Sequence, residues 1–108
     1  MTGCAYPDTP EWGGRPVARR VTDITPRCRV RLSGEVVSVR PGRWRGVRTL
    51  ICGLDDGTGL LGLHFTGRTE VAGMVVGTRC RVEGTVLSEA GGWVLWNPEL
   101  FIERRGQP

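Results

Sequence analysis

Apolar and polar positions alternate with a period of two along most of the chain from residue 27 onward. Cys28, Val30 and Leu32 alternate with arginine and serine, and three valines continue the pattern beyond Gly34. This alternation is typical of a half-buried β-strand. Because a glycine inside a strand commonly marks a bulge or bend, we predict one long strand that bends near Gly34 and serves both sides of a small barrel.

Two further strands follow, joined by a short turn. Each carries three apolar residues at alternate positions: Leu50, Cys52 and Leu54 in one, and Leu61, Leu63 and Phe65 in the other. The residues between them, Asp-Asp-Gly-Thr-Gly at 55–59, contain an Asp-Gly pair. Between alternating segments, Asp-Gly is a strong signal for a β-hairpin.

The rest of the pattern predicts a fourth strand over 79–86 and a closing strand over 92–103. The segment 67–77 lacks the alternation, and we expect a short helical turn around 71–74 that plugs one end of the barrel. The pair Asn97-Pro98 requires an edge position or a bulge, since proline cannot donate to the strand ladder. The predicted fold is all-β: a five-stranded OB-fold, which is a partly open Greek-key barrel, with a helical turn between strands 3 and 4.

The chain has room for one domain. Residues 1–20 hold three prolines and three glycines without periodicity, so we expect a flexible N-terminal arm there. The OB-fold domain is predicted over 21–103, followed by a basic tail over 104–108. No stretch is long and apolar enough to span a membrane, and the first residues lack the apolar core of a signal peptide. We therefore expect a cytoplasmic location.

The four cysteines give no sign of a metal site. Cys4, Cys28, Cys52 and Cys80 form no CxxC pair, and the chain has a single histidine, so zinc-ligand spacing is absent. Three of the cysteines occupy apolar positions of predicted strands, where a free thiol usually acts as a small core residue. We expect structural thiols, no metal and no cofactor.

The positive charge is concentrated in one loop. All fifteen basic residues are arginine, and the formal net charge is +4. Over 21–103 the charges nearly cancel, but residues 40–48 carry four arginines, and no acid lies between Glu35 and Asp55. In the predicted loop after the first strand, Arg43, Arg45 and Arg48 surround Trp44. Arginine contacts phosphates in bidentate fashion and stacks on bases, and exposed indoles stack on bases as well.

Further candidate binding residues lie on later strands. His64 points away from the predicted core, and Arg68 lies in the turn after it. Trp93 and Trp96 have opposite parity, so one ring should be buried and the other available for stacking, with Trp96 favoured as the exposed one. A solvated loop and an incidental surface histidine are the competing interpretations.

The segments VRLSGEVVSVR, LDDGTGLLGLHF, GRTEVAGMVVGTRCRVEGTV and NPEL occur in this order over residues 21–103. With them, the chain resembles the small OB-fold nucleic-acid-binding proteins of actinobacteria, which are similar to the wedge-type OB domain of fork-remodelling helicases. The resemblance implies binding of single-stranded or junction DNA, or of RNA, without chemistry. Trp44 and the additional arginines of the first loop depart from that pattern.

We therefore expect a sequence-tolerant binder of single-stranded DNA or RNA. The alternative is a protein-interaction module that uses the barrel face or an edge strand, and a homodimer through edge strands stays open. An enzyme is not expected, since the chain has no phosphate-loop motif and no serine or cysteine beside a base. Asp55 and Asp56 are adjacent, so they point apart and suit a turn better than acid–base catalysis.

Overall fold

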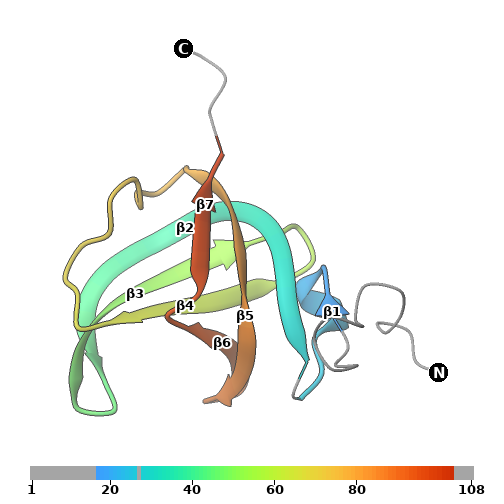
Figure 1. The fold of residues 1–108 in the computed structure, drawn as a ribbon, viewed down its shortest axis with the longest axis horizontal. Coiled ribbons are helices and arrows are strands. Elements are labelled where there is room, and N and C mark those ends of the chain that lie inside the picture. Colours follow the sequence, from blue (N-terminus) through green and yellow to red (C-terminus); the bar gives the residue numbers. More distant parts are fainter. Residues whose placement is uncertain (1–16, 27, 104–108) are drawn as a thin grey trace.

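The computed structural model describes residues 17–26 and 28–103 and is built almost entirely from β-strands (Figure 1). The strands are β1 (Val17–Ala18), β2 (Arg29–Trp44), β3 (Val47–Asp55), β4 (Leu60–Thr66), β5 (Arg79–Glu89), β6 (Gly92–Trp96) and β7 (Glu99–Ile102). The one helical element in these residues is a single 3-10 turn, Val21–Asp23. The predicted all-β class is therefore confirmed.

Five of the strands form a closed ring. The strand order in the sheet is β1-β2-β3-β4-β6-β5-β7, and an additional pairing of β2 with β5 closes β2, β3, β4, β6 and β5 on themselves. Within the ring only β4 and β6 are parallel. β1 runs parallel to the start of β2, and β7 runs antiparallel to β5. Four of the ring strands correspond to predicted strands 1 to 4, and β6 is the first part of the predicted closing strand. β7, the second part of that strand, lies outside the ring and pairs only with β5.

β2 is the strand that both sides of the ring share, as its pattern predicted. Its first half pairs with β5 and its second half with β3, and Figure 1 shows it arching over the barrel. A Cβ on Gly34 would lie 2.6 Å from the backbone oxygen of Asp55, so a side chain would clash where β3 ends against β2. The irregularity in the pairing lies slightly further on, between Val36 and Ser38.

The closing strand breaks at Asn97-Pro98, and both of its parts pair with β5. Leu95 of β6 lies opposite Val86. Glu99 of β7 lies opposite Glu83. Between these two pairs the closing strand therefore contains one residue more than the facing part of β5. Asn97, at the break, has a φ of 49°. An extra residue of this kind is a β-bulge, which is what the proline was expected to require.

The helical turn predicted around 71–74 is wrong. These residues form a β-turn, in which the Met74 N–H donates to the Val71 carbonyl over 3.0 Å. Gly73 has a φ of 80°, and a glycine with positive φ at the third position is typical of a type II turn rather than a helix. Met74 is buried and Val71 packs against the core, so the segment still covers one end of the barrel.

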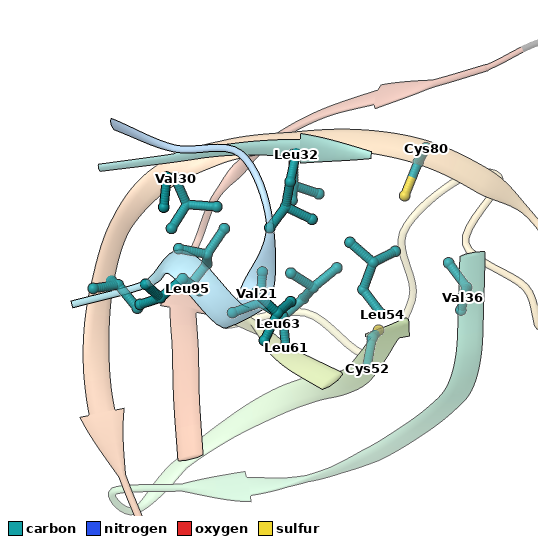
Figure 2. Close-up of a cluster of buried hydrophobic side chains, with 14 of the residues drawn as sticks. Val21, Val30, Leu32, Val36, Cys52, Leu54, Leu61, Leu63, Cys80 and Leu95 are labelled. Atoms are coloured by element: carbon teal, nitrogen blue, oxygen red, sulfur yellow. The ribbon is translucent and has the colours of Figure 1, made fainter. Parts of the chain in front are cut away.

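The interior of the ring is filled by the alternating apolar side chains of its strands, which point toward one another in Figure 2. The largest fully buried ones include Val30, Leu54, Leu61, Leu63 and Leu95. Cys28, Cys52 and Cys80 are buried free thiols, as predicted, and burial raises the pKa of Cys52 to about 11. Cys4 lies outside the described residues.

The segment before β2 docks on the β3–β4 turn. Oδ2 of Asp56 accepts a hydrogen bond of 2.9 Å from the Val21 N–H, and Oδ1 accepts one of 2.8 Å from the Thr58 N–H. Partial burial raises the pKa of Asp56, but hydrogen bonds from Thr58, Val21 and Gly59 outweigh it, and the pKa is lowered. Val17–Ala18 are buried as β1. Residues 1–16 of the predicted arm and the tail 104–108 lie outside the described part.

Candidate nucleic-acid interface

The outward side chains of β3, β4 and β6 form one side of the barrel, which we call the outer wall. Ile51 lies opposite His64, and His64 lies opposite Trp96. Alternate residues of a strand point to opposite faces, so these three share the outward face while their neighbours face the core. Val47 has the same parity at the start of β3, and its partner Trp44 at the end of β2 lies on the same side. The Trp44 indole therefore lies on this wall, against the rings of His64 and Trp96.

Trp44 is covered by its neighbours, although it lies outside the core. Its ring meets His64 edge to face, with 4.6 Å between the ring centroids and 79° between the planes. The Trp96 ring lies 6.5 Å away, and the guanidinium carbon of Arg45 lies 4.6 Å from the Trp44 centroid. Only 9% of Trp44 is exposed. We call Trp44, Arg45, His64 and Trp96 the Trp44 cluster.

The predicted exposed indole in an open loop is therefore wrong for a local reason. β2 runs on to Trp44 and β3 begins at Val47, so Arg45 and Gly46 are the whole turn. Both have positive φ, 56° and 81°, as in the two-residue turns that suit the twist of β-hairpins. Pro41 does not end the strand, because it lies in the half of β2 that pairs only with β3, and an edge position tolerates proline.

Arg45 connects the β2–β3 turn to the end of β5. Its Nη2 lies 3.1 Å from Oε1 of Glu89. The pKa of Glu89 is lowered, first by this hydrogen bond and then by the indole N–H of Trp44. That N–H lies near the carboxylate without reaching hydrogen-bond geometry. Glu89 thus neutralises one of the arginines that were predicted to contact phosphate.

His64 points outward from β4 as expected, but it is not on a solvent face. Only 7% of it is exposed, because Trp44 lies over it. Burial lowers the pKa of His64 and the nearby Glu89 raises it, while Arg40 and Arg45 lower it further. The balance favours the neutral imidazole, which suits a packing role beneath the indole.

Arg43 and Arg48 are separated from Trp44 by the pleat of the hairpin. They lie directly opposite each other on β2 and β3, with the parity of the core-facing residues, and both are exposed at the end of the barrel. Nη1 of Arg43 donates to the Gly46 carbonyl over 3.0 Å. The predicted ring of three arginines around one indole is therefore split between two faces, and only Arg45 contacts Trp44.

The two tryptophans of β6 differ as their parity predicted. Trp96 is 56% exposed, whereas Trp93 is partly buried and packs against the core. The indole N–H of Trp96 donates to the Thr66 hydroxyl over 3.3 Å, and Nδ2 of Asn97 donates to the same oxygen over 3.0 Å. The Thr66 N–H in turn donates to Oδ1 of Asn97 over 2.9 Å. This network holds the exposed ring in place on the outer wall.

Arg40, Arg43, Arg48 and Arg68 are exposed arginines with no carboxylate partner within the part of the chain that the structure describes, and of these Arg43 already donates to the Gly46 carbonyl. Arg40 lies opposite Ile51 on the outer wall. The Arg48 carbonyl accepts a hydrogen bond from the Gly67 N–H, which brings Arg48 to the barrel end that carries Arg68. Sequence reasoning had not singled out Arg40, or Thr66 and Asn97, whose roles depend on a strand pairing that no local pattern reveals.

A pocket of about 170 Å³ adjoins the Trp44 cluster. It is lined by Trp44, Arg45, Val47, Thr66, Leu87 and Trp96. Its lining is mostly apolar, and its polar groups are the guanidinium of Arg45 and the hydroxyl of Thr66. In the described residues no group of three His, Cys, Asp or Glu side chains could hold a metal ion, and none of their helices is long and apolar enough to cross a membrane.

No protein-family model matches the chain, and no curated protein matches it significantly.

Proposed function

We propose that the protein binds single-stranded nucleic acid on the outer wall, without chemistry and with little sequence preference. The observation that carries the proposal is the exposed Trp96 ring, held by Thr66 on the side of the barrel that also carries Arg40, while Arg68 lines a pocket together with Thr66. Neither arginine is paired with a described carboxylate. Proteins that bind single strands combine a cationic surface with aromatic rings on which bases stack. Trp44 is packed against His64 within the wall, and Trp96 takes the stacking role.

The ring of strands supports an OB-fold as the scaffold of this function. The closed order β2-β3-β4-β6-β5, with its single parallel pair, agrees with the five-stranded Greek-key barrel of that fold. OB-folds bind oligonucleotides on the face of their second and third strands and on the adjacent loops. In this chain those strands are β3 and β4, which carry the outer wall.

The test is a titration of a fluorescent dT12 oligonucleotide at several salt concentrations, with rU12 in parallel. If Arg40, Arg48 and Arg68 each contact one phosphate, log K should fall against log salt with a slope near −2, since each contact on a single strand contributes about −0.7. Each Arg→Gln substitution at these positions should weaken binding and reduce the slope. Arg79→Gln is the matched control, because Arg79 faces Glu103 at 3.9 Å on another side of the barrel.

Binding that does not depend on salt, or that weakens equally in the control and in the three variants, would contradict the proposal. A higher affinity for dT12 than for rU12 would indicate DNA as the preferred ligand, and the reverse order would indicate RNA.

A protein-interaction module is the second candidate, favoured by the apolar lining of the pocket at Trp96 and by exposed Val47 on its rim. A partner that the protein retains from a nuclease-treated lysate, and that Trp96→Ala loses, would favour this candidate. Loss of every partner on nuclease treatment favours nucleic acid.

A further inference from the structure

A second and larger pocket, of about 540 Å³, opens between the segment 67–77 and the break between β6 and β7. Its apolar lining comes from Phe65, Val71, Pro98 and Leu100, and its polar lining from Thr66, Arg68 and Asn97. We call it the Arg68 pocket. Its volume falls within the range of about 300–1,000 Å³ that is usual for sites of small ligands.

The segment 67–77 supplies two lining residues of the pocket, Arg68 and Val71, and Val71 begins the turn described above. Met74 enters the core, whereas Val71 is only partly buried at the pocket wall. Arg68 lies at this wall as an exposed cation, and none of the described carboxylates is paired with it. The pocket therefore combines apolar surface with one guanidinium that is free to bind an anion.

The Arg68 pocket adjoins the stacking site at Trp96 through shared residues. Thr66 lines both the Arg68 pocket and the smaller pocket beside Trp96. Asn97 follows Trp96 directly in the chain, and both side chains donate to the Thr66 hydroxyl. The network thus fixes the two pockets side by side at a constant spacing.

Another pocket that Trp96 lines is less suited to binding a nucleic-acid strand. A pocket of about 450 Å³ on that side is lined by Glu83 and Glu99 together with Arg29. Glu83 is already paired with Arg31 and Arg81, but Glu99 is exposed and its carboxylate repels phosphates, so a strand stacked on Trp96 meets less repulsion when it continues toward Arg68. This asymmetry gives the bound strand a preferred path.

We infer that the Arg68 pocket holds the nucleotide next to the one stacked on Trp96, with its phosphate on Arg68 and its base against the apolar lining. The inference rests on the proposed function. It fits both kinds of surface in the pocket, since a guanidinium forms paired hydrogen bonds with phosphate oxygens and a base offers an apolar face to Phe65 and Leu100.

The test fills the pocket and leaves the outer wall intact. Val71→Trp should occupy the pocket and weaken dT12 binding by about fivefold or more, the equivalent of one lost stacked base from the low end of its range upward. Val75→Trp is the matched control, because Val75 is exposed on the same segment and does not line the pocket. Chemical denaturation of each variant establishes that it is folded before binding is compared.

A second measurement uses a probe too small to reach Trp96 and the pocket at once. In an NMR titration with dTMP, the amides of Arg68, Val71 and Leu100 should shift more than with thymidine or with inorganic phosphate. If phosphate and dTMP give equal shifts that are confined to the Arg68 amide, Arg68 is only a surface site for anions and the pocket does not bind the base. If dT12 binds and Trp96→Ala weakens it while Val71→Trp does not, the inference fails and the proposed function stands. If no oligonucleotide binds at all, both fail.

Discussion

An arginine lies over an aromatic ring at two places in the molecule, with different surroundings. Arg45 lies 4.6 Å from the centroid of Trp44 on the outer wall, and Arg81 lies 4.4 Å from that of Phe101 where β5 pairs with β7. Trp44 is closed in by a histidine and a second tryptophan, whereas Phe101 stays 41% exposed. The same contact therefore belongs to a packed cluster in one place and to an open strand surface in the other.

The charges around the two rings differ as well. Near Phe101 the arginines are matched by glutamates: Arg31 and Arg81 lie 3.5 Å and 3.4 Å from Glu83, and Arg79 lies 3.9 Å from Glu103. On the side of Trp44, Glu89 matches Arg45, but Arg40 and Arg68 have no such partner among the described residues. An arginine over a ring is thus not by itself a sign of a binding site. An exposed ring on a side of the barrel that carries unpaired cations is the more selective sign, which is why the proposed site is centred on Trp96.

The largest expected effect is on stability and separates the two rings directly. Trp44→Ala should lower the free energy of unfolding by about 3 kcal/mol, the low end for truncating a buried aromatic side chain, because one side of the ring borders a pocket. Phe101→Ala should cost about 1 kcal/mol or less, since the ring is partly exposed and loses mainly its contact with Arg81. Urea denaturation followed by far-UV circular dichroism measures both.

Equal losses in the two variants would show that Trp44 is no better packed than Phe101. In that case the Trp44 indole would be free to act as a second stacking surface, which is the role that the sequence pattern predicted for it.

Most of the barrel could be predicted because its determinants are local. The alternation in β2, β3, β4 and β5 specified which side chains face the core, and the Asp-Gly turn and the bulge at Asn97-Pro98 were readable from the residues themselves. The β-turn at 71–74 was not readable in this way, since Gly73 has a positive φ that its neighbours do not reveal. Burial of the Met74 side chain is enough to cover the end of the barrel without a helix.

The candidate site was less predictable because it depends on pairing and turn length. The predicted loop would have left Trp44 exposed, but the two-residue turn Arg45-Gly46 places Trp44 against His64 and sends Arg43 and Arg48 to the other face. The short turn could not be read from the sequence, since Arg45 is an unusual residue for positive φ. Thr66 and Asn97 became part of the site only through the parallel pairing of β4 with β6.

The next effect is on binding and tests the ring that remains exposed. Trp96→Ala should weaken dT12 binding by about 1 to 3 kcal/mol, the usual contribution of one stacked base. Phe101→Ala should leave binding unchanged, because the cations around that ring are already paired. Fluorescence anisotropy at constant salt measures both affinities. A loss in the Phe101 variant as large as in the Trp96 variant would move the site to the face formed by β5 and β7.

A smaller effect isolates Arg45 by means of a second hairpin of the same kind. Ala90 has a φ of 47° in the turn between β5 and β6, next to Gly91, and it makes no side-chain contact comparable to that of Arg45. Ala90→Asn should therefore stabilise the protein by about 1 kcal/mol, since asparagine tolerates this conformation better. Arg45→Asn makes the same gain in the turn but loses the contacts with Trp44 and Glu89, so its net change should be smaller. An equal gain from both substitutions would show that Arg45 adds nothing to the Trp44 cluster.

The smallest effect follows pH and should arise at the Trp44 cluster alone, because His64 is the single histidine of the chain. Its pKa in the folded protein lies below the usual value, chiefly through burial, so folding favours the neutral form. The resulting stability is complete above the unfolded pKa of about 6.5 and is lost as the pH falls from there through the folded pKa. Between about pH 7.5 and 5.5 the free energy of unfolding should fall in the wild type and change less in His64→Phe, which keeps an aromatic ring beneath Trp44.

Asp56 and Glu89 have lowered pKa values and titrate at more acidic pH, so they affect both proteins equally in this window. Parallel pH profiles for the two proteins would mean that His64 takes up its proton without disturbing the indole, and the cluster would then be no more sensitive to charge than the surface around Phe101.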